Sequence, residues 1–573
     1  MDYKENFKLW SDALKGTEYE KELNCLKDDE KLVEDSFYKY LEFGTAGMRG
    51  ILSLGTNRMN IFTVRRCTQG LADYVKKCGN EQKGVVIAYD SRNYSDVFAK
   101  DTALVLAANG IKVYLYDCLH SVPQLSFALL QLRCANGVVI TASHNPPEYN
   151  GYKVYGADGG QVAPEDAAEI SAFIDKIGDY FDIQPMDEDS AVKAGLLVYI
   201  GEEMDERYYG MVKELSLNPD VIARQADKLN IVYTPLYGTG YKPVTSLLKL
   251  IGIKSLHVVQ EQKLPNGNFP GLKAPNPEEK SAYTEAIKLA EKVDANMIIA
   301  TDPDCDRMGL CVKNTQGEFV TLTGNQIGCL LMDYILSQRE AEFSGDEFVC
   351  KSIVSTELAD AIAKKYGVEM RHVLTGFKFI AEQIKIADKC GRGKFVFGFE
   401  ESYGYLAGTF VRDKDAAMSA MLISECACYY ADKGMTMYEA LMSLYKKYGY
   451  YVEKVISLTL KGMGGISKIK AAVETLRKST PKSIGNYKVL AVTDLISGIR
   501  HDMVTLEDEP DDFPAADVLI FELEGAKMIL RPSGTEPKLK AYCFTKGSDA
   551  SQADTRLKQL VDTTFELMTA LTR

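Results

Sequence analysis

Histidine, tryptophan and long apolar runs are what this chain has least of. Its 573 residues include five histidines and one tryptophan, and no run approaches 18 consecutive apolar residues. Because a membrane-spanning helix needs about 20 predominantly apolar residues, the sequence predicts no membrane span. The first stretch, MDYKENFKLWSDALKG, has no apolar centre, so we expect no secretory signal.

Paired cysteine motifs are also missing. The 13 cysteines are scattered, no C-x-x-C occurs, and the two nearest are Cys426 and Cys428. No histidine accompanies such a pair, so a zinc site is not expected. Scattered, unpaired thiols are typical of a reducing compartment, and we therefore expect a cytoplasmic protein.

Positive charge is in the minority. Lysine and arginine number 67 against 80 aspartates and glutamates, which gives a formal net charge of −13. This balance argues against nucleic acid or an anionic membrane as the partner. It still allows an anionic small molecule to bind at a locally basic site. The sequence leaves the oligomeric state open between monomer and dimer.

A recurring order of β-branched run, glycine turn and helix dominates the first 450 residues. The run GVVIAY (84–89) precedes a helical stretch that ends near Gly110, and IKVYLYD and GVVITAS follow as strands. The series restarts near residues 230 and 347, and one long helix is expected after Pro277. From about residue 451 the pattern changes to strands with helices near 467–477 and 554–571. We predict an α/β protein with three similar mixed α/β domains in tandem and a smaller C-terminal α+β domain.

An acidic loop, ATDPDCDRMG (300–309), follows the apolar run 297–300. Asp302, Asp304 and Asp306 would repel one another unless a cation lay among them. Oxygen ligands suit Mg²⁺ or Ca²⁺ and not zinc. An EF-hand is excluded, because Arg307 stands where that loop needs glycine and Lys313 where it needs glutamate. The plain alternative is a solvated acidic turn.

Magnesium commonly takes phosphate oxygens besides carboxylates, and two loops have the residues of a phosphate cradle. LRPSGTEPK (530–538) carries a guanidinium, hydroxyls and a glycine turn, and FGTAGMRG (43–50) is similar in make-up with Arg49. A third loop, GFEESYGY (398–405), follows a predicted strand, and its Glu400 and Ser402 suit sugar hydroxyls. Taken singly, each loop can also be an ordinary turn.

The stretch VVITASHNPPEYNGYKVY (138–155) presents Ser143 where an apolar run ends. A serine-hydrolase elbow needs G-x-S-x-G, which T-A-S-H-N does not provide. Two interpretations remain. Ser143 and Asn145 could bond the turn itself, or Ser143 could carry a phosphate whose oxygens complete the Mg²⁺ shell begun by the three aspartates.

Four motifs, TASHNPPEYNGYKVY, TDPDCDRMG, GFEESYGY and RPSGTEPK, together resemble the α-D-phosphohexomutases, the phosphoglucomutase/phosphomannomutase superfamily. The resemblance covers nearly the whole chain. FGTAGMRG and the Glu-Glu-Ser loop are most similar to the bacterial phosphoglucomutase branch, which is related to phosphopentomutases.

The resemblance implies four domains around a central cleft. These are 1–205 with the phosphoserine loop, 206–322 with the metal loop, 323–450 with the sugar loop and 451–573 with a phosphate-binding loop. It implies a phosphoglucomutase that interconverts glucose 1-phosphate and glucose 6-phosphate, with Mg²⁺ as cofactor and glucose 1,6-bisphosphate as intermediate and activator. A phosphopentomutase or phosphomannomutase of the same mechanism is the alternative, and a phosphatase or a sugar-phosphate sensor are competing classes.

The resemblance also implies roles for single residues. The residues implied around the transferring phosphoryl group are phosphorylated Ser143, Arg49, His144, Lys153, Arg307 and Lys414. The implied Mg²⁺ ligands are Asp302, Asp304, Asp306 and the Ser143 phosphate. The implied substrate-binding residues are Thr375, Gly376, Glu400, Ser402, Arg531, Ser533, Gly534, Thr535 and Lys538. Many phosphomannomutases carry a histidine just after the sugar loop, where this chain has Tyr403 and Gly404. Lys153, His144 and Lys414 are therefore the candidates for the general base.

Overall fold

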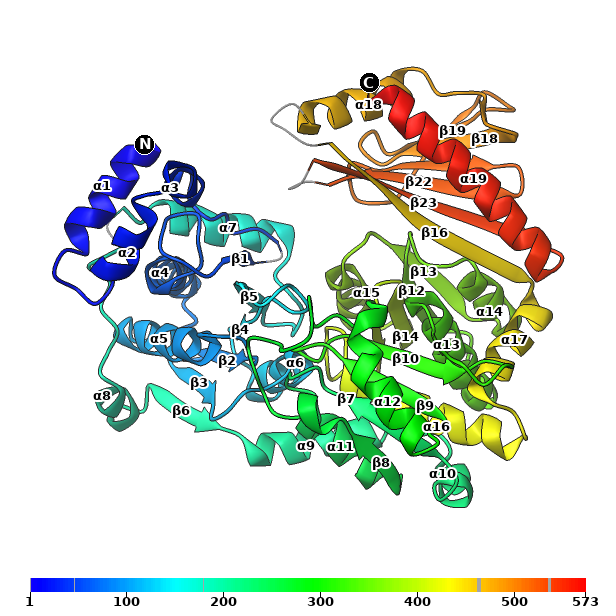
Figure 1. Ribbon diagram of the computed structural model, residues 1–573, viewed down its shortest axis with the longest axis horizontal. Coiled ribbons are helices and arrows are strands. Elements are labelled where there is room, and N and C mark those ends of the chain that lie inside the picture. Colours follow the sequence, from blue (N-terminus) through cyan, green and yellow to red (C-terminus); the bar gives the residue numbers. More distant parts are fainter. Residues whose placement is uncertain (1, 46, 179, 461–464, 534–536, 573) are drawn as a thin grey trace. The chain divides into compact units, whose positions relative to one another are not determined.

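The computed structural model describes residues 2–45, 47–178, 180–460, 465–533 and 537–572 (Figure 1). Across these residues, no helix combines the length and the apolar character that crossing a membrane requires.

The chain divides into two compact units. The first comprises Met1–Ile327 and Ile380–Met437, and the second comprises Gly328–Phe379 and Tyr438–Arg573. Three helices have residues in both units: α13 (Gly324–Arg339), α15 (Phe377–Cys390) and α17 (Met437–Tyr448).

The first unit begins with a six-stranded mixed sheet. In spatial order its strands are β1 (Met48–Ile51), β5 (Tyr149–Gly156), β4 (Asn136–Ile140), β2 (Val85–Tyr89), β3 (Val113–Tyr116) and β6 (Leu197–Ile200). Strands β4, β2, β3 and β6 run parallel to one another. Strand β5 pairs antiparallel with β4, and β1 pairs antiparallel with β5. The strand–helix–strand prediction is confirmed here. The carboxyl ends of β2 and β4 meet at one edge of the sheet, where such folds bind ligands.

Helices accompany this first sheet. They are α1 (Tyr3–Ala13), α2 (Glu20–Leu26), α3 (Glu30–Phe37), α4 (Ile61–Lys77), α5 (Ser95–Ala108), α6 (Val122–Leu132), α7 (Pro164–Asp175) and α8 (Glu188–Lys193). Local signals set their ends. The Asn60 side chain caps α4 by accepting from two backbone N–H groups, and Ser121 with Gln124 forms a capping box on α6. Gly110, just past α5, has φ +75°, which suits the glycine stop predicted there.

A second mixed sheet follows in the same unit. Its strands in spatial order are β11 (Phe319–Thr321), β10 (Met308–Lys313), β9 (Met297–Thr301), β7 (Asn230–Thr234) and β8 (Ser255–Val258). Its helices are α9 (Glu202–Lys213), α10 (Pro219–Gln225), α11 (Tyr241–Leu250), η1 (Gln260–Gln262), η2 (Lys280–Tyr283) and α12 (Thr284–Lys292). The long helix expected after Pro277 is wrong, because α12 has nine residues and begins at Thr284. The Tyr283 hydroxyl donates to the Pro277 carbonyl, which holds the preceding segment in turns.

The first unit ends with the hairpin of β14 (Lys394–Glu400) and β15 (Gly404–Ala407), followed by α16 (Ala416–Asp432). α16 packs against α10, α11 and β15, and most of its residues are buried. A backbone bridge between Arg307 and Gly404 joins β15 to the loop that follows β9.

The second unit contains a parallel pair and a large antiparallel sheet. The pair is β12 (Glu347–Ser352) and β13 (Glu369–Val373), with η3 (Glu340–Glu342) and α14 (Leu358–Tyr366). The sheet runs β16 (Tyr450–Thr459), β23 (Lys538–Gly547), β22 (Ala526–Pro532), β21 (Leu519–Leu523), β18 (Tyr487–Asp494), β19 (Ile499–Asp502) and β20 (Asp508–Pro510), and β17 (Ser483–Ile484) pairs with β18. α18 (Gly465–Lys478) and α19 (Ala550–Leu571) cover it, and Figure 1 shows α19 along β16 and β23. The predicted C-terminal α+β domain is confirmed.

Candidate active site

The acidic triplet, Asp302, Asp304 and Asp306, lies in the turn that connects β9 to β10. The three side chains are buried, and one carboxylate oxygen of each lies within 4.8 Å of the others. Backbone N–H groups of Asp306 and Arg307 donate to Asp302 Oδ1 at 3.1 and 3.0 Å. The strand exit predicted from the apolar run 297–300 therefore gathers three carboxylates at one point.

The triplet has the properties of a site for a hard cation. Asp304 Oδ1 and Asp306 Oδ1 are buried and have no hydrogen-bond partner among the described residues. A buried carboxylate oxygen without a partner is costly, and Mg²⁺ prefers such ligands. Burial and the neighbouring carboxylates raise the pKa of Asp302. Burial acts in the same direction on Asp304, but the Lys153 ammonium, together with Asp302 and Lys414, outweighs burial and holds the pKa of Asp304 below its ordinary value. The residues present fit a divalent ion.

Two buried lysines face the triplet. Lys153, on β5, places Nζ 2.8 Å from Asp304 Oδ2. Lys414 places Nζ 3.0 Å from Asp306 Oδ2 and 2.8 Å from Asp413 Oδ1. Burial alone would lower the pKa of Lys414, but Asp306 and Asp413 outweigh burial and raise it. Lys414 therefore holds its proton firmly, which suits charge stabilisation better than proton abstraction.

Ser143 points at the triplet. It lies just beyond β4, is 4% exposed, and has the left-handed φ of 51°. Its hydroxyl donates to Asp302 Oδ2 at 2.8 Å, across 159 positions of sequence, and Oγ lies 3.2 Å from His144 Nδ1. The hydroxyl thus contacts both the acidic loop and its own neighbour His144.

Arg92 is a site residue that sequence reasoning missed. It follows β2 and is 2% exposed. We call the segment from Thr141 to Tyr149, which connects β4 to β5, the serine loop. The Arg92 guanidinium donates to four backbone carbonyls of this loop, those of Ser143, Asn145, Pro146 and Tyr149.

Asp90 was missed as well. Its Oδ2 accepts from the Thr141 hydroxyl at 2.6 Å, and Thr141 Oγ1 accepts the Ser143 N–H at 2.8 Å. The sequence does contain a signal for Asp90 and Arg92. Polar residues, D-S-R, follow the apolar run GVVIAY in the same way that S-H-N follows the apolar run GVVITA. Parallel neighbouring strands bring their carboxyl ends to one edge, so these exits meet.

Three further predicted residues surround the serine loop. Arg49, on β1, donates from Nη1 to Asn145 Oδ1 at 3.0 Å. Arg307 donates from Nη1 to Glu278 Oε1 at 2.6 Å. Burial, with the charges of Arg307 and Arg49, lowers the pKa of His144 well below its ordinary value. The imidazole is therefore neutral at pH 7 and can accept a proton.

The predicted sugar loop lies beside the acidic loop in the same unit. Glu400 ends β14 and is 5% exposed, and Ser402 lies in the turn before β15. The Met308 N–H donates to the Tyr403 carbonyl at 3.0 Å, which adds to the Arg307–Gly404 bridge. Glu400 and Ser402 thus lie at the end of the β14–β15 hairpin that borders the triplet.

The remaining predicted residues belong to the second unit. Thr375 and Gly376 form the bend before α15, and Gly376 has φ +124°. Arg531 lies on β22, and the Ser533 N–H donates to the Lys538 carbonyl at 2.8 Å. Gly534 and Thr535 lie outside the described residues.

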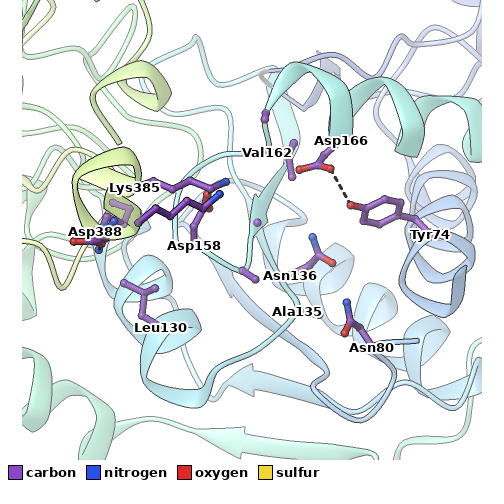
Figure 2. A pocket seen from close by; sticks show the side chains of 15 residues that line it. Tyr74, Asn80, Leu130, Ala135, Asn136, Asp158, Val162, Asp166, Lys385 and Asp388 are labelled. Carbon is purple, nitrogen blue, oxygen red and sulfur yellow. Dashed lines mark hydrogen bonds and ion pairs between the residues drawn. The ribbon is translucent and has the colours of Figure 1, made fainter. Parts of the chain in front are cut away.

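A cavity of about 510 Å³ lies elsewhere in the first unit (Figure 2). Asn136, which begins β4, lines it, whereas Ser143 follows the opposite end of that strand. Lys385 on its wall is paired with Asp158 at 2.6 Å, and the Tyr74 hydroxyl donates to Asp166. None of the predicted site residues lines this cavity, so we do not take it as the active site despite its size.

Comparisons with known proteins match one family over most of the chain. Family models described as phosphoglucomutase/phosphomannomutase, alpha/beta/alpha domains I, II and III, match residues 40–181, 206–317 and 323–448. A phosphoglucomutase of Staphylococcus saprophyticus is 38% identical over 506 residues, covering 88% of this chain and 90% of its own. A phosphoglucomutase of Staphylococcus haemolyticus is 38% identical over 511 residues, covering 89% and 91%.

Solved structures share the fold. The open form of parafusin, a phosphoglucomutase of Paramecium, matches with a TM-score of 0.68 at 16% identity, over 93% of this chain and 95% of its own. A phosphoglucomutase/phosphomannomutase family protein of Burkholderia thailandensis matches with a TM-score of 0.64 at 18% identity, over 94% and 98%.

Proposed function

The chain belongs to the phosphoglucomutase/phosphomannomutase family, and we propose that it interconverts glucose 1-phosphate and glucose 6-phosphate. Phosphoserine 143 would carry the phosphoryl group, with glucose 1,6-bisphosphate as the intermediate. One observation supports this most directly. The Ser143 hydroxyl lies 2.8 Å from a carboxylate of a buried acidic triplet that has two unpartnered oxygens. We also propose that the enzyme works in the cytoplasm.

The proposed magnesium ligands are the acidic triplet and an oxygen of the Ser143 phosphate. A bound Mg²⁺ would offset negative charge on the transferring phosphoryl group. The chain's own cations add to this. Lys414 stays protonated beside the triplet, and Arg49 and Arg307 lie near the serine loop, where they can stabilise developing oxyanion charge.

The proposed reaction has two balanced half-reactions. The O6 hydroxyl of glucose 1-phosphate attacks the phosphorus of phosphoserine 143, the P–Oγ bond breaks, and the hydroxyl proton passes through a base to Ser143 Oγ. After the bisphosphate reorients, Ser143 Oγ attacks the phosphorus of the C1 phosphate, the P–O1 bond breaks, and the Ser143 proton passes through the base to sugar O1, which releases glucose 6-phosphate. The base is the neutral His144, 3.2 Å from Ser143 Oγ, or Lys153.

The remaining motif residues are proposed to hold the sugar and its second phosphate. Glu400 and Ser402 would bind sugar hydroxyls, with Thr375 and Gly376 beside the ring. The proposed grip on the phosphate that does not react consists of Arg531, Ser533, Gly534, Thr535 and Lys538. The support for these roles is the match to the family motifs. The same match supports the domains 1–205, 206–322, 323–450 and 451–573 around one cleft.

A coupled assay tests the proposal. Glucose 1-phosphate is supplied with Mg²⁺, with and without a trace of glucose 1,6-bisphosphate, and glucose 6-phosphate is followed. We expect Ser143→Ala to lower kcat by at least about 1,000-fold, because the nucleophile is lost. Ser424→Ala is the matched control, since Ser424 is also buried and its hydroxyl donates to the Ala420 carbonyl within α16.

Near-normal turnover in Ser143→Ala would refute the phosphoserine role. Mannose 1-phosphate and ribose 1-phosphate, run in parallel, separate phosphoglucomutase from phosphomannomutase and phosphopentomutase. Release of free phosphate in place of an isomer would identify a phosphatase.

A further inference from the structure

We propose that Arg92 is a positioning residue that holds the serine loop so that Ser143 Oγ faces the acidic triplet. This inference rests on the proposed mutase function. Within the described residues, the hydrogen bonds of the Arg92 guanidinium to the loop all go to backbone carbonyls and none goes to Ser143 Oγ. Its effect on catalysis therefore has to pass through the backbone that carries Ser143.

The first observation is the number of carbonyls that one guanidinium engages. Nη1 donates to the carbonyls of Pro146 at 2.8 Å and Tyr149 at 3.0 Å, and Nη2 donates to those of Ser143 at 2.5 Å and Asn145. The loop thereby curls around a single planar group. Among the side chains, only a guanidinium offers five N–H donors in a rigid fork.

The second observation is the second tie at the start of the loop. Asp90 lies 3.5 Å from Arg92 Nε and accepts from the Thr141 hydroxyl at 2.6 Å. Thr141 Oγ1 in turn accepts the Ser143 N–H. Asp90 and Arg92, which follow β2, thus hold the serine loop on both sides of Ser143.

The third observation is the backbone conformation that has to be held. Ser143 has φ 51°, a left-handed conformation that a residue with a Cβ keeps only when its surroundings impose it. The two prolines at 146 and 147 constrain their own φ angles and that of their neighbours, but not the φ of Ser143. The carbonyl of Ser143 is held by Arg92, and its N–H by Thr141, so both ends of the strained residue are fixed.

The fourth observation is that the Arg92 guanidinium is shielded from water, since Arg92 is only 2% exposed. The Phe269 ring, itself fully buried, lies over the guanidinium with 5.0 Å from Cζ to the ring centroid. Asn93 Nδ2 donates to Asn268 Oδ1 at 2.8 Å and holds that segment in place. Without competing water, hydrogen bonds from a charged donor are stronger and more directional. The arrangement suits a group whose task is precise placement.

The test uses Arg92→Ala and Arg92→Lys in the full chain, with Arg65→Ala as the matched control. Arg65 is a largely buried arginine that pairs with Asp101 at 2.7 Å and does not contact the serine loop. Steady-state kcat and KM for glucose 1-phosphate are measured beside melting temperature. For Arg92→Ala we expect kcat to fall by about 100-fold with KM changed less than about threefold, because misplacement of a reacting group costs roughly that factor.

Guanidinium added well below denaturing concentration provides a readout that a merely structural role would not move. It should restore part of the kcat of Arg92→Ala by occupying the vacated place, and it should not raise the kcat of Arg65→Ala. No rescue, or a wild-type kcat in folded Arg92→Ala, would overturn the proposal. If Arg92→Ala does not fold, Arg92→Lys decides. An ammonium cannot reach four carbonyls, so kcat should be at least about 10-fold below wild type, and a wild-type kcat would overturn the proposal.

The wild-type enzyme separates the two claims. If it shows no mutase activity with any sugar phosphate, the proposed function fails. If it is active and the Arg92 results go the other way, only the positioning role fails.

Discussion

At the scale of single residues, several carboxylates near Ser143 share a small number of cations. Lys153 pairs with Asp304, but Lys414 is shared between Asp306 and Asp413, and Arg307 is paired with Glu278. Burying uncompensated carboxylates is costly, and these carboxylates stay charged only with further positive charge nearby. A divalent ion supplies that charge, and a phosphorylated serine would add further negative charge and increase the need for it.

The prediction at this scale concerns Asp304→Asn. The amide keeps the shape and one oxygen but removes the charge that attracts the ion, so we expect the Kd for Mg²⁺ to rise by at least about 10-fold. Mutase turnover should fall with it. Isothermal titration calorimetry of the two proteins measures the affinity directly. Asp12→Asn, which changes an exposed carboxylate on α1, is the control and should bind Mg²⁺ like wild type. Unchanged affinity in Asp304→Asn would contradict a metal site at the triplet.

Sequence reasoning reached some of these residues and missed others for a physical reason. An apolar strand that ends in charged or hydroxyl residues is visible in one stretch of chain, and Ser143 and the triplet are of this kind. Arg92 acts only because β2 lies beside β4, and strand order is a tertiary fact. The bond between Ser143 and Asp302 spans 159 positions and follows from no local pattern.

At the scale of elements, periodicity predicts those strands and helices that have one buried face. α19 is such a helix, and its Leu560, Val561 and Met568 are buried as the apolar pattern predicts. α16 is different. It is buried on nearly all sides, so its sequence AAMSAMLISECACYYAD shows no polar face for a period to reveal. Helix α16 was therefore not predicted, although its N-terminus directly follows Lys414.

α16 carries a buried carboxylate that anchors the segment before α10. Glu425 accepts from Ser216 Oγ at 2.5 Å, the Leu217 N–H at 2.7 Å and the Asn218 N–H at 2.6 Å. Glu425→Ala removes the acceptor of these partly buried donors, so we expect the free energy of unfolding to fall by about 1–3 kcal/mol. Glu425→Gln retains an accepting oxygen and should lose less.

Urea unfolding followed by circular dichroism measures this effect. Glu206→Ala, on the exposed face of α9, is the matched control and should change stability by less than about 0.5 kcal/mol. Equal stability of Glu425→Ala and Glu206→Ala would show that the Glu425 anchor does not contribute to folding.

At the scale of the whole molecule, long-range packing goes beyond what patterns show. Residues 328–379 contain the first strands of the third strand–helix series, yet they group with the C-terminal sheet in the second compact unit. Ile353, Val354 and Leu374, in the segments after β12 and β13, pack with Ile520 and other apolar residues of that sheet. The class of each domain follows from local periodicity, whereas this grouping depends on contacts between segments more than 100 positions apart.

The pH dependence of global stability is likewise a property of all titrating groups together. Both ring nitrogens of His120 are engaged, Nε2 with Asp205 Oδ1 and Nδ1 with the Cys118 carbonyl, each at 2.9 Å. Lys242 pairs with the other oxygen of Asp205, and the Tyr116 ring stacks on the imidazole. Burial alone would lower the pKa of His120, but the Asp205 carboxylate and the Cys118 contacts outweigh it and raise the pKa to about 9.

Because the folded pKa of His120 lies above the unfolded value near 6.5, its contribution to stability is complete below pH 6.5 and is lost as pH rises toward 9. The size of the shift corresponds to about 3 kcal/mol of unfolding free energy. Buried thiols lower stability in the same direction but at higher pH, because burial raises the pKa of Cys134 to about 12 and of Cys543 to about 11, and unfolded cysteine ionises near pH 8.5.

Urea unfolding of wild type should therefore show falling stability from pH 6.5 upward. His120→Gln should reduce the fall between pH 6.5 and 8 and keep the fall above 8.5, since the thiols remain. An unchanged slope between pH 6.5 and 8 in His120→Gln would mean that the His120–Asp205 pair does not govern stability in that range.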